Sequence, residues 1–417
     1  EYFEFRLVRE ALMEREVLLK AMPHISWPMR FVLPYHKDMR FSSDTPASRL
    51  LRAFLPWMKG RRPNWLLWFG LFGYDHLGGR KTLPATKTLS LADGPEGRPL
   101  RDHFKKAYEY SDCWVEDSRL VVLNARDAKE RGATIHTRCE MINANCKNGV
   151  WVIETLNRET GETTHHRARM VVNAAGPWVG DILQSKLRLN TSDGVRLVRG
   201  SHIVTHKLFD HDKSYFFQGE DGRIIFAIPY ETDFTLIGTT DVDHSDSSQN
   251  SKCSEEEKSY LIAFANKYFK DKISRKDIVW TYSGVRPLCD DRVQNASAVT
   301  RDYKLKVDRS AGAPILNIFG GKITTYRRLA ESAMEIINTQ LGGNGGVWTA
   351  GLPLPGGNFA VDKVEDLIQE LKERFAFLTD TWARRLVRAY GMEATVVLGS
   401  AKFKEDLGRD FGGTLFE

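Results

Sequence analysis

The sequence is poor in cysteine, and its cysteines do not have the spacing of a disulfide framework or of a zinc site. Among 417 residues there are five, an odd and scattered set without a CxxC pair: Cys113, Cys139, Cys146, Cys253 and Cys289. Disulfide-dependent domains carry many closely spaced cysteines, and structural zinc sites carry paired ones. We therefore expect reduced thiols in a cytosolic compartment, and neither a disulfide framework nor a zinc site.

Several other signatures are also missing. The best apolar run, from Trp65 to Tyr74, is much shorter than the ~18 residues that a membrane-spanning helix needs. The metalloprotease HExxH, the hydrolase GxSxG and the P-loop motif are absent. Asp241, Asp243 and His244 lack further ligands at a convincing spacing, so we expect no metal. A GxGxxG turn is absent too, so these residues alone do not hold a complete dinucleotide-binding domain.

Aromatic and charged residues, in contrast, are plentiful. The chain contains 22 Phe, 13 Tyr and 10 Trp, which excludes a disordered chain. With 60 Lys and Arg against 54 Asp and Glu, the net charge is +6. This mildly basic balance suits anionic small molecules or an anionic membrane surface and does not require nucleic acid. At roughly 150 residues per domain, the length predicts two or three domains.

Hydrophobic periodicity predicts both helical and extended segments. Helical spacing marks residues 3–22, 107–130, 254–269 and the stretch after Tyr326. Short strands between Gly200 and Asp241, separated by turns, predict an antiparallel sheet. Further strands are expected at 150–156, 168–173, 278–285, 298–307 and 315–319, with a hairpin turn at 158–161. Two amphipathic helices follow a Gly-rich linker, the second with Thr379 or Asp380 as N-cap and Gly391 as its stop.

Two glycine turns are candidates for binding an anion or a polarised carbonyl. One strand runs into Ala174-Ala175-Gly176-Pro177-Trp178, and another runs into Gly320-Gly321-Lys322-Ile323-Thr324-Thr325. Each turn opens a helix, and a helix N-terminus offers unpaired backbone N–H groups. Either turn alone is a weak signal, because small residues after a strand usually serve packing. Two of them in one chain favour a binding function.

Several polar residues lie in apolar strand contexts. Arg286 and Arg301 fit either a structural ion pair or a guanidinium fork for a carboxylate or phosphate. His202 fits either a structural residue or a base, and Thr239-Thr240 either an ordinary turn or part of a site. Residues 49–69 interleave Arg and Lys with Trp, Leu and Phe, which suits a membrane interface or a loop packed on its own domain.

Six segments appear in one order: Glu109–Trp114, Asn173–Trp178, Arg199–His202, Gly238–Asp241, Trp280–Leu288 and Phe319–Arg327. Together they closely resemble the FAD-dependent glycerol-3-phosphate dehydrogenases of aerobic bacteria and mitochondria, members of the D-amino-acid-oxidase-like flavoprotein superfamily. The resemblance covers nearly the whole chain. It departs in three places, since the family's GxGxxG turn and Arg-Tyr substrate contact should precede Glu1, residues 40–62 look longer than in a typical member, and the family's C-terminal domain continues past Glu417.

The resemblance implies a fold of α/β plus α+β type. A Rossmann-like FAD-binding domain, whose N-terminal βαβ unit is missing here, would accompany an antiparallel-sheet substrate domain and the start of a C-terminal helical domain. Residues 1–195 would be the first part of the FAD domain, with 37–105 partly a substrate- or membrane-side insertion. Residues 196–313 would be the substrate domain, 314–345 the second part of the FAD domain, and 352–417 the start of the helical domain.

The resemblance also implies an activity, the oxidation of sn-glycerol 3-phosphate to dihydroxyacetone phosphate in glycerol and glycerophospholipid catabolism, with electrons passing through FAD to ubiquinone. His202, Arg286 and Lys322 would be catalytic, His202 as base and the two cations on the phosphate. Arg301, Thr239 and Thr240 would complete the substrate site. The FAD contacts would be Ala174, Ala175, Gly176 and Trp178 in one turn, and Gly320, Gly321, Lys322, Thr324 and Thr325 in the other.

Such an enzyme would be cytoplasmic and peripherally associated with the inner membrane, and it could form a homodimer. Two alternatives remain in view. One is a glycerophosphate oxidase of the same superfamily, which passes electrons to oxygen. The other is a catalytically dead fragment, because the main ADP-binding turn is absent from these residues and FAD binding by them alone is expected to be poor.

Overall fold

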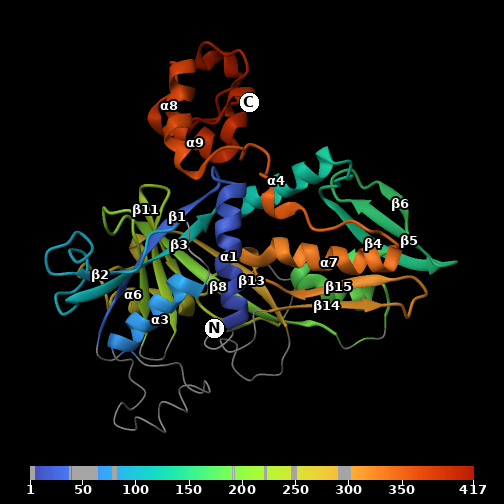
Figure 1. Cartoon of the computed structure of the whole chain (residues 1–417), viewed down its shortest axis with the longest axis horizontal. Helices are drawn as coiled ribbons and strands as arrows, with labels where there is room; N and C mark the ends of the chain where they lie inside the picture. The colour runs from blue at the N-terminus through green and yellow to red at the C-terminus, as the bar shows by residue number, and fades with distance from the viewer. Residues whose placement is uncertain are drawn as a thin grey trace, which may run out of the picture.

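A large sheet, two smaller sheets and a group of C-terminal helices make up the computed structural model (Figure 1). It describes residues 5–36, 39, 64–77, 82–189, 191, 193–219, 223–245, 251–289 and 302–417. Helix α1 (Phe5–Ala21), predicted at 3–22, runs between the large sheet and α7 (Tyr326–Leu341). The predicted mixture of helix and strand is therefore present.

The large sheet has nine strands and is mostly antiparallel. The order is β12-β8-β11-β10-β9-β1-β3-β2, and β13 pairs with the other edge of β8. The bounds are β1 Ser26–Pro34, β2 Lys87–Ser90, β3 Lys106–Val115, β8 Val195–His206, β9 Ser214–Gln218, β10 Ile224–Tyr230, β11 Phe234–Gly238, β12 Val242–Asp243 and β13 Ile278–Cys289. The strands predicted between residues 200 and 241 are confirmed. The sheet also takes in β1, β2 and β3, which lie outside the predicted 196–313 segment.

One face of this sheet buries the main apolar core beneath α6 (Glu255–Ala265). Ile203 and Ile237 of the sheet belong to the same cluster as Leu261 and Phe264 of the helix, and each is at most 5% exposed. Burying a side chain of this size contributes roughly 1.5–3 kcal/mol. This packing fixes α6, predicted at 254–269, against the back of the strands that carry the candidate site.

Residues 107–130, predicted as one helix, form a strand followed by a helix. β3 pairs with β1 over its whole length, from Ser26 opposite Val115 to Pro34 opposite Ala107. Only α4 (Asp117–Glu130) is helical. Residues 107–111 are all buried, because both faces of the sheet are covered there. The strand therefore lacks the alternation of buried and exposed residues that would have distinguished it from a helix.

Of the two smaller sheets, one carries both glycine turns. In this sheet, β14 (Tyr303–Asp308), β15 (Ile315–Gly320) and β7 (Val171–Asn173) lie side by side, with β15 and β7 parallel. β14 thus belongs to this sheet and not to the predicted 196–313 unit. The other consists of β4 (Cys139–Lys147), β5 (Val150–Asn157) and β6 (Thr163–Ala168), and its predicted hairpin turn has Gly161 at φ +74°. After β7, the chain forms the short α5 (Val179–Asp181) and a π-helical turn at Ile182–Lys186.

A buried cluster of charges joins α1 to α7. Arg327 donates from Nε to Glu14 Oε2 at 2.8 Å and from Nη2 to Glu14 Oε1 at 2.6 Å. Its Nη1 also donates to Glu331 and, at 2.9 Å, to Thr349. Arg327 and both glutamates are at most 8% exposed. Removing one partner from such a cluster costs about 3–5 kcal/mol, because it leaves a buried charge unpaired.

The C-terminal helices form their own small core. They are α8 (Val364–Arg374), α9 (Asp380–Tyr390) and α10 (Ala394–Leu398). Thr379 caps α9 by accepting a hydrogen bond from the Trp382 N–H at 3.3 Å, and Gly391 follows its last residue, both as predicted.

His24 is buried where these helices meet the rest of the chain. Its side chain is 0% exposed, and neither ring nitrogen has a hydrogen-bond partner among the described residues. A Cβ added to Gly391 would lie 3.1 Å from His24 Cγ. Burial, reinforced by the nearby charge of Arg119, lowers the pKa of His24 to about 4. The junction therefore contains an imidazole that is neutral in the folded protein.

Candidate active site

Arg286, near the end of β13, is held by polar groups of residues 239–241. Its Nη1 donates to Asp241 Oδ1 at 2.5 Å, and its Nη2 donates to Thr239 Oγ1 at 3.1 Å. The Arg286 side chain is 31% exposed and that of Asp241 22%. Both interpretations of Arg286 thus have support, since it forms an ion pair and is also accessible as a fork for a phosphate or carboxylate. Gly200 leaves room for it, because an added Cβ there would lie 2.5 Å from Nη2.

His202 lies two residues from Gly200 on β8, so their side-chain positions share a face of the sheet. Its ring stacks on Tyr282 of β13, with centroids 4.9 Å apart and an interplanar angle of 15°. A Cβ added to Gly238 would lie 2.1 Å from His202 Cδ2, so only glycine fits there. Burial, and then the charge of Arg286, lowers the pKa of His202 to about 4. The imidazole is therefore neutral near pH 7 and able to accept a proton.

Thr239 and Thr240 lie on opposite sides of their strand segment. The Thr239 hydroxyl contacts Arg286, as expected for a residue on the substrate side. Thr240 is only 4% exposed, and its hydroxyl donates to Glu257 Oε1 at 2.7 Å on the α6 side of the sheet. The predicted substrate contact therefore does not fit the Thr240 side chain. Its carbonyl oxygen still accepts from Arg286 Nη1 at 3.4 Å.

The two glycine turns lie beside the end of β13. Asn317 of β15 is opposite Asn173 of the parallel β7, so both turns leave the same edge of the sheet. A Cβ added to Gly176, at φ +56°, would lie 3.9 Å from Pro287 Cγ. One added to Gly320, at φ +73°, would lie 3.1 Å from Cys289 Sγ. The strand–turn–helix arrangement predicted for both tracts is confirmed, and both lie next to the strand that carries Arg286.

The turns also present a surface that fits FAD. Ala174 and Gly321 are exposed, and Trp178 and Ile323 are 52% and 44% exposed. Positive-φ glycines let a ligand approach the main chain closely, and exposed apolar residues beside them suit a planar ring system. Ligands of α/β sheets bind at such strand ends.

The remaining predicted contacts of the second turn have different exposures. Lys322 is half-buried at the start of the 3₁₀ turn Ile323–Thr325, in which Thr324 is exposed and Thr325 is buried. The α-helix itself begins at Tyr326, directly after this turn, where the helical spacing predicts it. Arg301 and residues 49–63 of the basic tract lie outside the described residues, so their predicted roles stay predictions.

Two polar pairings of the site are not predicted by the sequence. Asp241, which lies in one of the six segments and lacks the further ligands of a metal site, pairs with Arg286. Within the described part of the chain no group of three or more metal-binding side chains occurs. Asn173 donates from Nδ2 to Asn317 Oδ1 and to the Val179 carbonyl oxygen, each at 3.1 Å, and both asparagines are nearly fully buried. This pair anchors the first turn to β15, and the only sequence signal for it was a polar residue at the end of each apolar strand.

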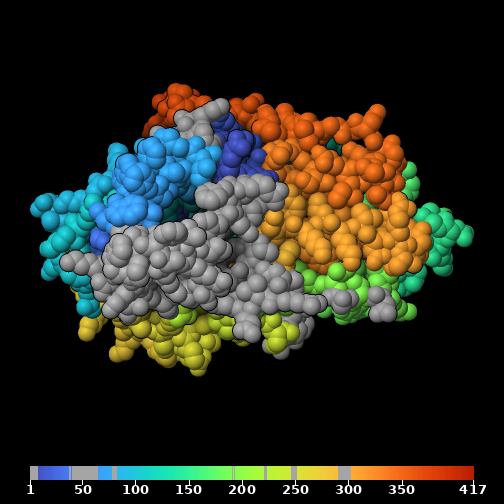
Figure 2. Space-filling view, turned by 60° about the horizontal axis from the view of Figure 1, so that its bottom comes forward, coloured from blue at the N-terminus to red at the C-terminus, as the bar shows by residue number. Residues whose placement is uncertain are grey.

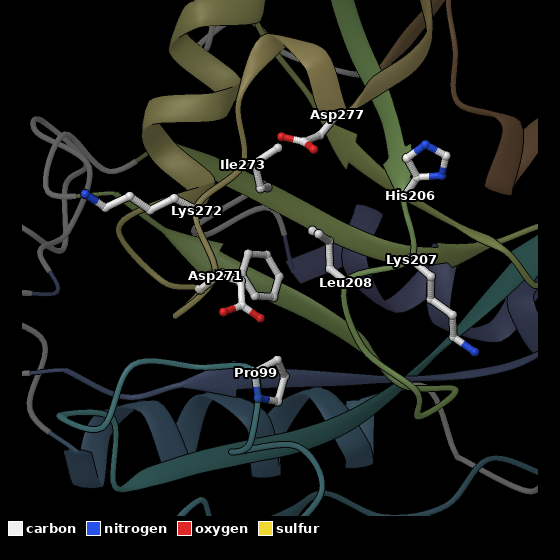
Figure 3. A pocket seen from close by; sticks show the side chains of 9 residues that line it. Pro99, His206, Lys207, Leu208, Asp271, Lys272, Ile273 and Asp277 are labelled. Carbon is white, nitrogen blue, oxygen red and sulfur yellow. The ribbon is translucent and has the colours of Figure 1, made fainter.

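A cavity of about 270 Å³ lies elsewhere, at the far end of β8 (Figure 3). Leu208, Ile273 and Pro99 line it together with His206 and Asp277, and Lys272 extends away from it. It contains none of the predicted site residues, so cavity volume does not identify the candidate active site.

Comparison with known proteins defines the family. The pattern of the DAO family, described as FAD dependent oxidoreductase, matches residues 1–326. The chain belongs to this family. This DAO-family oxidoreductase is 48% identical over its whole length to D-erythritol 1-phosphate dehydrogenase of Brucella abortus, of which it covers 79%. It is 42% identical to the aerobic glycerol-3-phosphate dehydrogenase of Escherichia coli, of which it covers 78%.

A solved structure supports the same assignment. The glycerol-3-phosphate dehydrogenase of Bacillus halodurans, complexed with FAD, superimposes on this DAO-family chain with a TM-score of 0.69 at 25% identity. The match covers 94% of this chain and 68% of that one. The predicted superfamily, the mixed α/β fold, the oxidoreductase class and FAD as the cofactor are therefore confirmed.

Proposed function

We propose that this flavoenzyme oxidises sn-glycerol 3-phosphate at its secondary carbon, giving dihydroxyacetone phosphate. The observation that carries the proposal is the position of the Arg286 fork beside a neutral His202, next to two turns that fit FAD. Two relatives named glycerol-3-phosphate dehydrogenase, of Escherichia coli and Pseudomonas aeruginosa, are 42% and 43% identical over the whole chain, which supports it.

Arg286, His202 and Lys322 each contribute to the proposed reaction. Arg286 binds the phosphate, which is remote from the reacting carbon, so its binding energy orients the C–H bond. His202 accepts the hydroxyl proton on an imidazole nitrogen as the alcohol is oxidised. Lys322, at the start of the second turn, adds positive charge at the phosphate. When bound, FAD supplies the two-electron acceptor.

Flavin reduction without oxygen tests the proposal directly. The complete protein, loaded with FAD and mixed anaerobically with glycerol 3-phosphate, should lose its oxidised-flavin absorbance and form one dihydroxyacetone phosphate per flavin. Glycerol, which lacks the phosphate, should reduce the flavin at least 100-fold more slowly. A flavin that neither glycerol 3-phosphate nor a longer phosphorylated polyol reduces would refute the proposed activity.

A four-carbon substrate is the second candidate. The relative from Brucella abortus, at 48% identity, is named for D-erythritol 1-phosphate. Both compounds are polyols with a terminal phosphate, so the same Arg286 fork suits either. The ratio of kcat/KM for the two compounds decides between them, and a ratio above ten in favour of D-erythritol 1-phosphate would reassign the substrate.

The electron acceptor is proposed to be ubiquinone. Reduced protein would be mixed with a soluble ubiquinone analogue or with oxygen, and the return of flavin absorbance followed. Reoxidation by the quinone should be much faster than by oxygen. Faster reoxidation by oxygen, with release of hydrogen peroxide, would instead identify an oxidase.

We also propose that the protein binds the cytoplasmic face of the inner membrane through α3 (Asn64–Leu77). Figure 2 shows α3 on the molecular surface, and its exposed side chains are aromatic: Trp65 54%, Trp68 42%, Phe69 56% and Phe72 45%. Trp and Phe favour the membrane interface, and clusters of this kind rarely lie free in water. Among the described helices none is long and apolar enough to cross a bilayer.

The vesicle test compares two exposed aromatic sites. Trp68→Ser with Phe72→Ser should reduce co-sedimentation with anionic vesicles several-fold. Phe403→Ser removes an aromatic ring that is 64% exposed in the C-terminal region and should leave binding unchanged. Equal binding by all variants would place the membrane contact outside α3.

A further inference from the structure

Strand β8 separates two sets of polar side chains. On one face, His202 and the space above Gly200 belong to the candidate active site. On the other face, Ser201 and Arg199 point toward α6, as the alternation of a strand requires. Both meet one carboxylate there. Ser201 Oγ donates to Glu257 Oε1 at 2.8 Å, and Arg199 Nη2 lies 3.0 Å from Glu257 Oε2.

Glu257 is unusual among its neighbours. It is the last of three consecutive glutamates, of which the first two are exposed while Glu257 is 5% exposed. Its Oε2 accepts from the Ser254 N–H at 2.9 Å, completing the capping box of α6. Although burial opposes ionisation, these hydrogen bonds hold its pKa below the ordinary glutamate value. The carboxylate is therefore charged, enclosed and fully used as an acceptor.

The hydrogen bonds of Glu257 can influence the active-site face of the sheet, because their partners Ser201 and Thr240 are adjacent in sequence to residues of the site. Ser201 directly precedes His202. Thr240, which donates to Glu257 Oε1 at 2.7 Å and accepts from the Ser201 N–H at 2.9 Å, lies between Thr239 and Asp241. Those two residues hold both ends of the Arg286 guanidinium. The Glu257 carboxylate, on the opposite face of the sheet, thus restrains the backbone next to His202 and the backbone between the two residues that hold Arg286.

We propose that Glu257 is a positioning residue for the phosphate fork and the base, acting through Thr240 and Ser201. The proposal rests on the proposed function for its kinetic test but not for its binding test. Gln is nearly isosteric, yet its amide nitrogen cannot accept from Ser254 N–H or pair with Arg199. In Glu257→Gln we expect backbone 239–241 to shift and Arg286 to lose its orientation, while α6 remains packed through its apolar face.

The experiment compares FAD-loaded Glu257→Gln with Glu256→Gln, an exposed neighbour on the same helix turn. Titration with inorganic phosphate, followed by flavin absorbance, measures the affinity of the Arg286 fork for phosphate without relying on turnover. Loss of the absorbance change in Arg286→Ala shows that the signal comes from phosphate bound at the fork. Glu257→Gln should weaken phosphate binding about tenfold, and kcat/KM for glycerol 3-phosphate should fall about 10- to 100-fold. In the same variant, the ratio of kcat/KM for glycerol 3-phosphate to kcat/KM for glycerol should fall as well. Glu256→Gln should match the wild type within twofold.

The outcomes separate the two proposals. If the wild type oxidises no phosphorylated polyol but Glu257→Gln still weakens phosphate binding, the proposed function fails and the positioning role stands. If Glu257→Gln matches Glu256→Gln in both measurements, the positioning role is wrong. Should Glu257→Gln not fold, Thr240→Val removes only the hydroxyl contacts of Thr240 with Glu257 and with the Ser201 N–H. It must produce the same loss of phosphate affinity, and an unchanged affinity would overturn the proposal.

Discussion

Replacement of Arg286 is the sharpest test of the site. Arg286→Ala removes the hydrogen bonds to Asp241 and Thr239 and leaves the Asp241 carboxylate facing the position of the substrate phosphate. The free energy lost therefore has two sources, the missing charge-assisted bond to phosphate and the new repulsion from Asp241. Arg286→Lys keeps the charge but loses the planar fork, so its effect should be intermediate.

The exposure of the pair sets the magnitude. Losing one partner of a desolvated charge pair costs about 2–5 kcal/mol. Because Arg286 is 31% and Asp241 22% exposed, water compensates part of this loss. We expect about 2–3.5 kcal/mol, or roughly 30- to 400-fold in kcat/KM for glycerol 3-phosphate. Glycerol has no phosphate, so its kcat/KM should change less than about fivefold.

Asp241→Asn supplies the matched control. By itself it keeps an oxygen acceptor for Arg286 and should cost little, but combined with Arg286→Ala it removes the repulsion and should recover about tenfold. The assay is steady-state kcat/KM for both substrates, on variants with equal FAD content and melting temperature. Equal losses for glycerol 3-phosphate and glycerol would show that Arg286 is a structural ion-pair residue and not the phosphate anchor.

Three further predictions follow from the buried groups. Because the pKa of His202 is about 4, kcat/KM for glycerol should stay constant from pH 8 to about 5, and an acid limb near 6.5 would show that the pKa of the base is not lowered in this site. An unfolded histidine titrates near 6.5 and His24 in the folded protein at about 4, so protonation favours the unfolded chain as pH falls through this window. Between pH 7.5 and 5 this should remove about 2 kcal/mol of unfolding free energy, so in urea titrations the total loss should be about 2 kcal/mol smaller for His24→Phe than for the wild type. Glu14→Gln leaves Arg327 partly unpaired and should lower the unfolding free energy by about 3 kcal/mol, and a change under 1 kcal/mol would disprove the importance of that cluster.

Local sequence patterns predicted the positions of most helices and strands but not which strands lie next to one another in the sheets. The strands between residues 200 and 241 and the capped helix at Asp380–Tyr390 follow from alternation, turns and a threonine cap, all of which are local. The parallel pairing of β1 with β9 joins Phe31 to Ser214 and leaves no local signal. β3 was mistaken for helix for a related reason, since neighbours on both faces removed its alternation.

The candidate site was predicted unevenly for the same physical reason. His202, Arg286 and the two turns could be chosen because characteristic residues flank each of them. Asp241 becomes the partner of Arg286 only when β13 pairs with β8, which no spacing reveals. The spacing of Ser254 and Glu257 indicates a capping box, but it does not show that Glu257 also contacts β8, because the phase of α6 against the sheet decides which carboxylate is buried there.

The arrangement of β13 has a consequence for how enzymes of this kind diverge. Within its 12 residues, Tyr282 stacks on His202, Arg286 forms the fork, and Pro287 and Cys289 lie against the two glycine turns. Inserting or deleting one residue would turn every later side chain to the opposite face. Substitutions around β13 should therefore change substrate preference with less damage to the site than a change in the length of the strand after Tyr282.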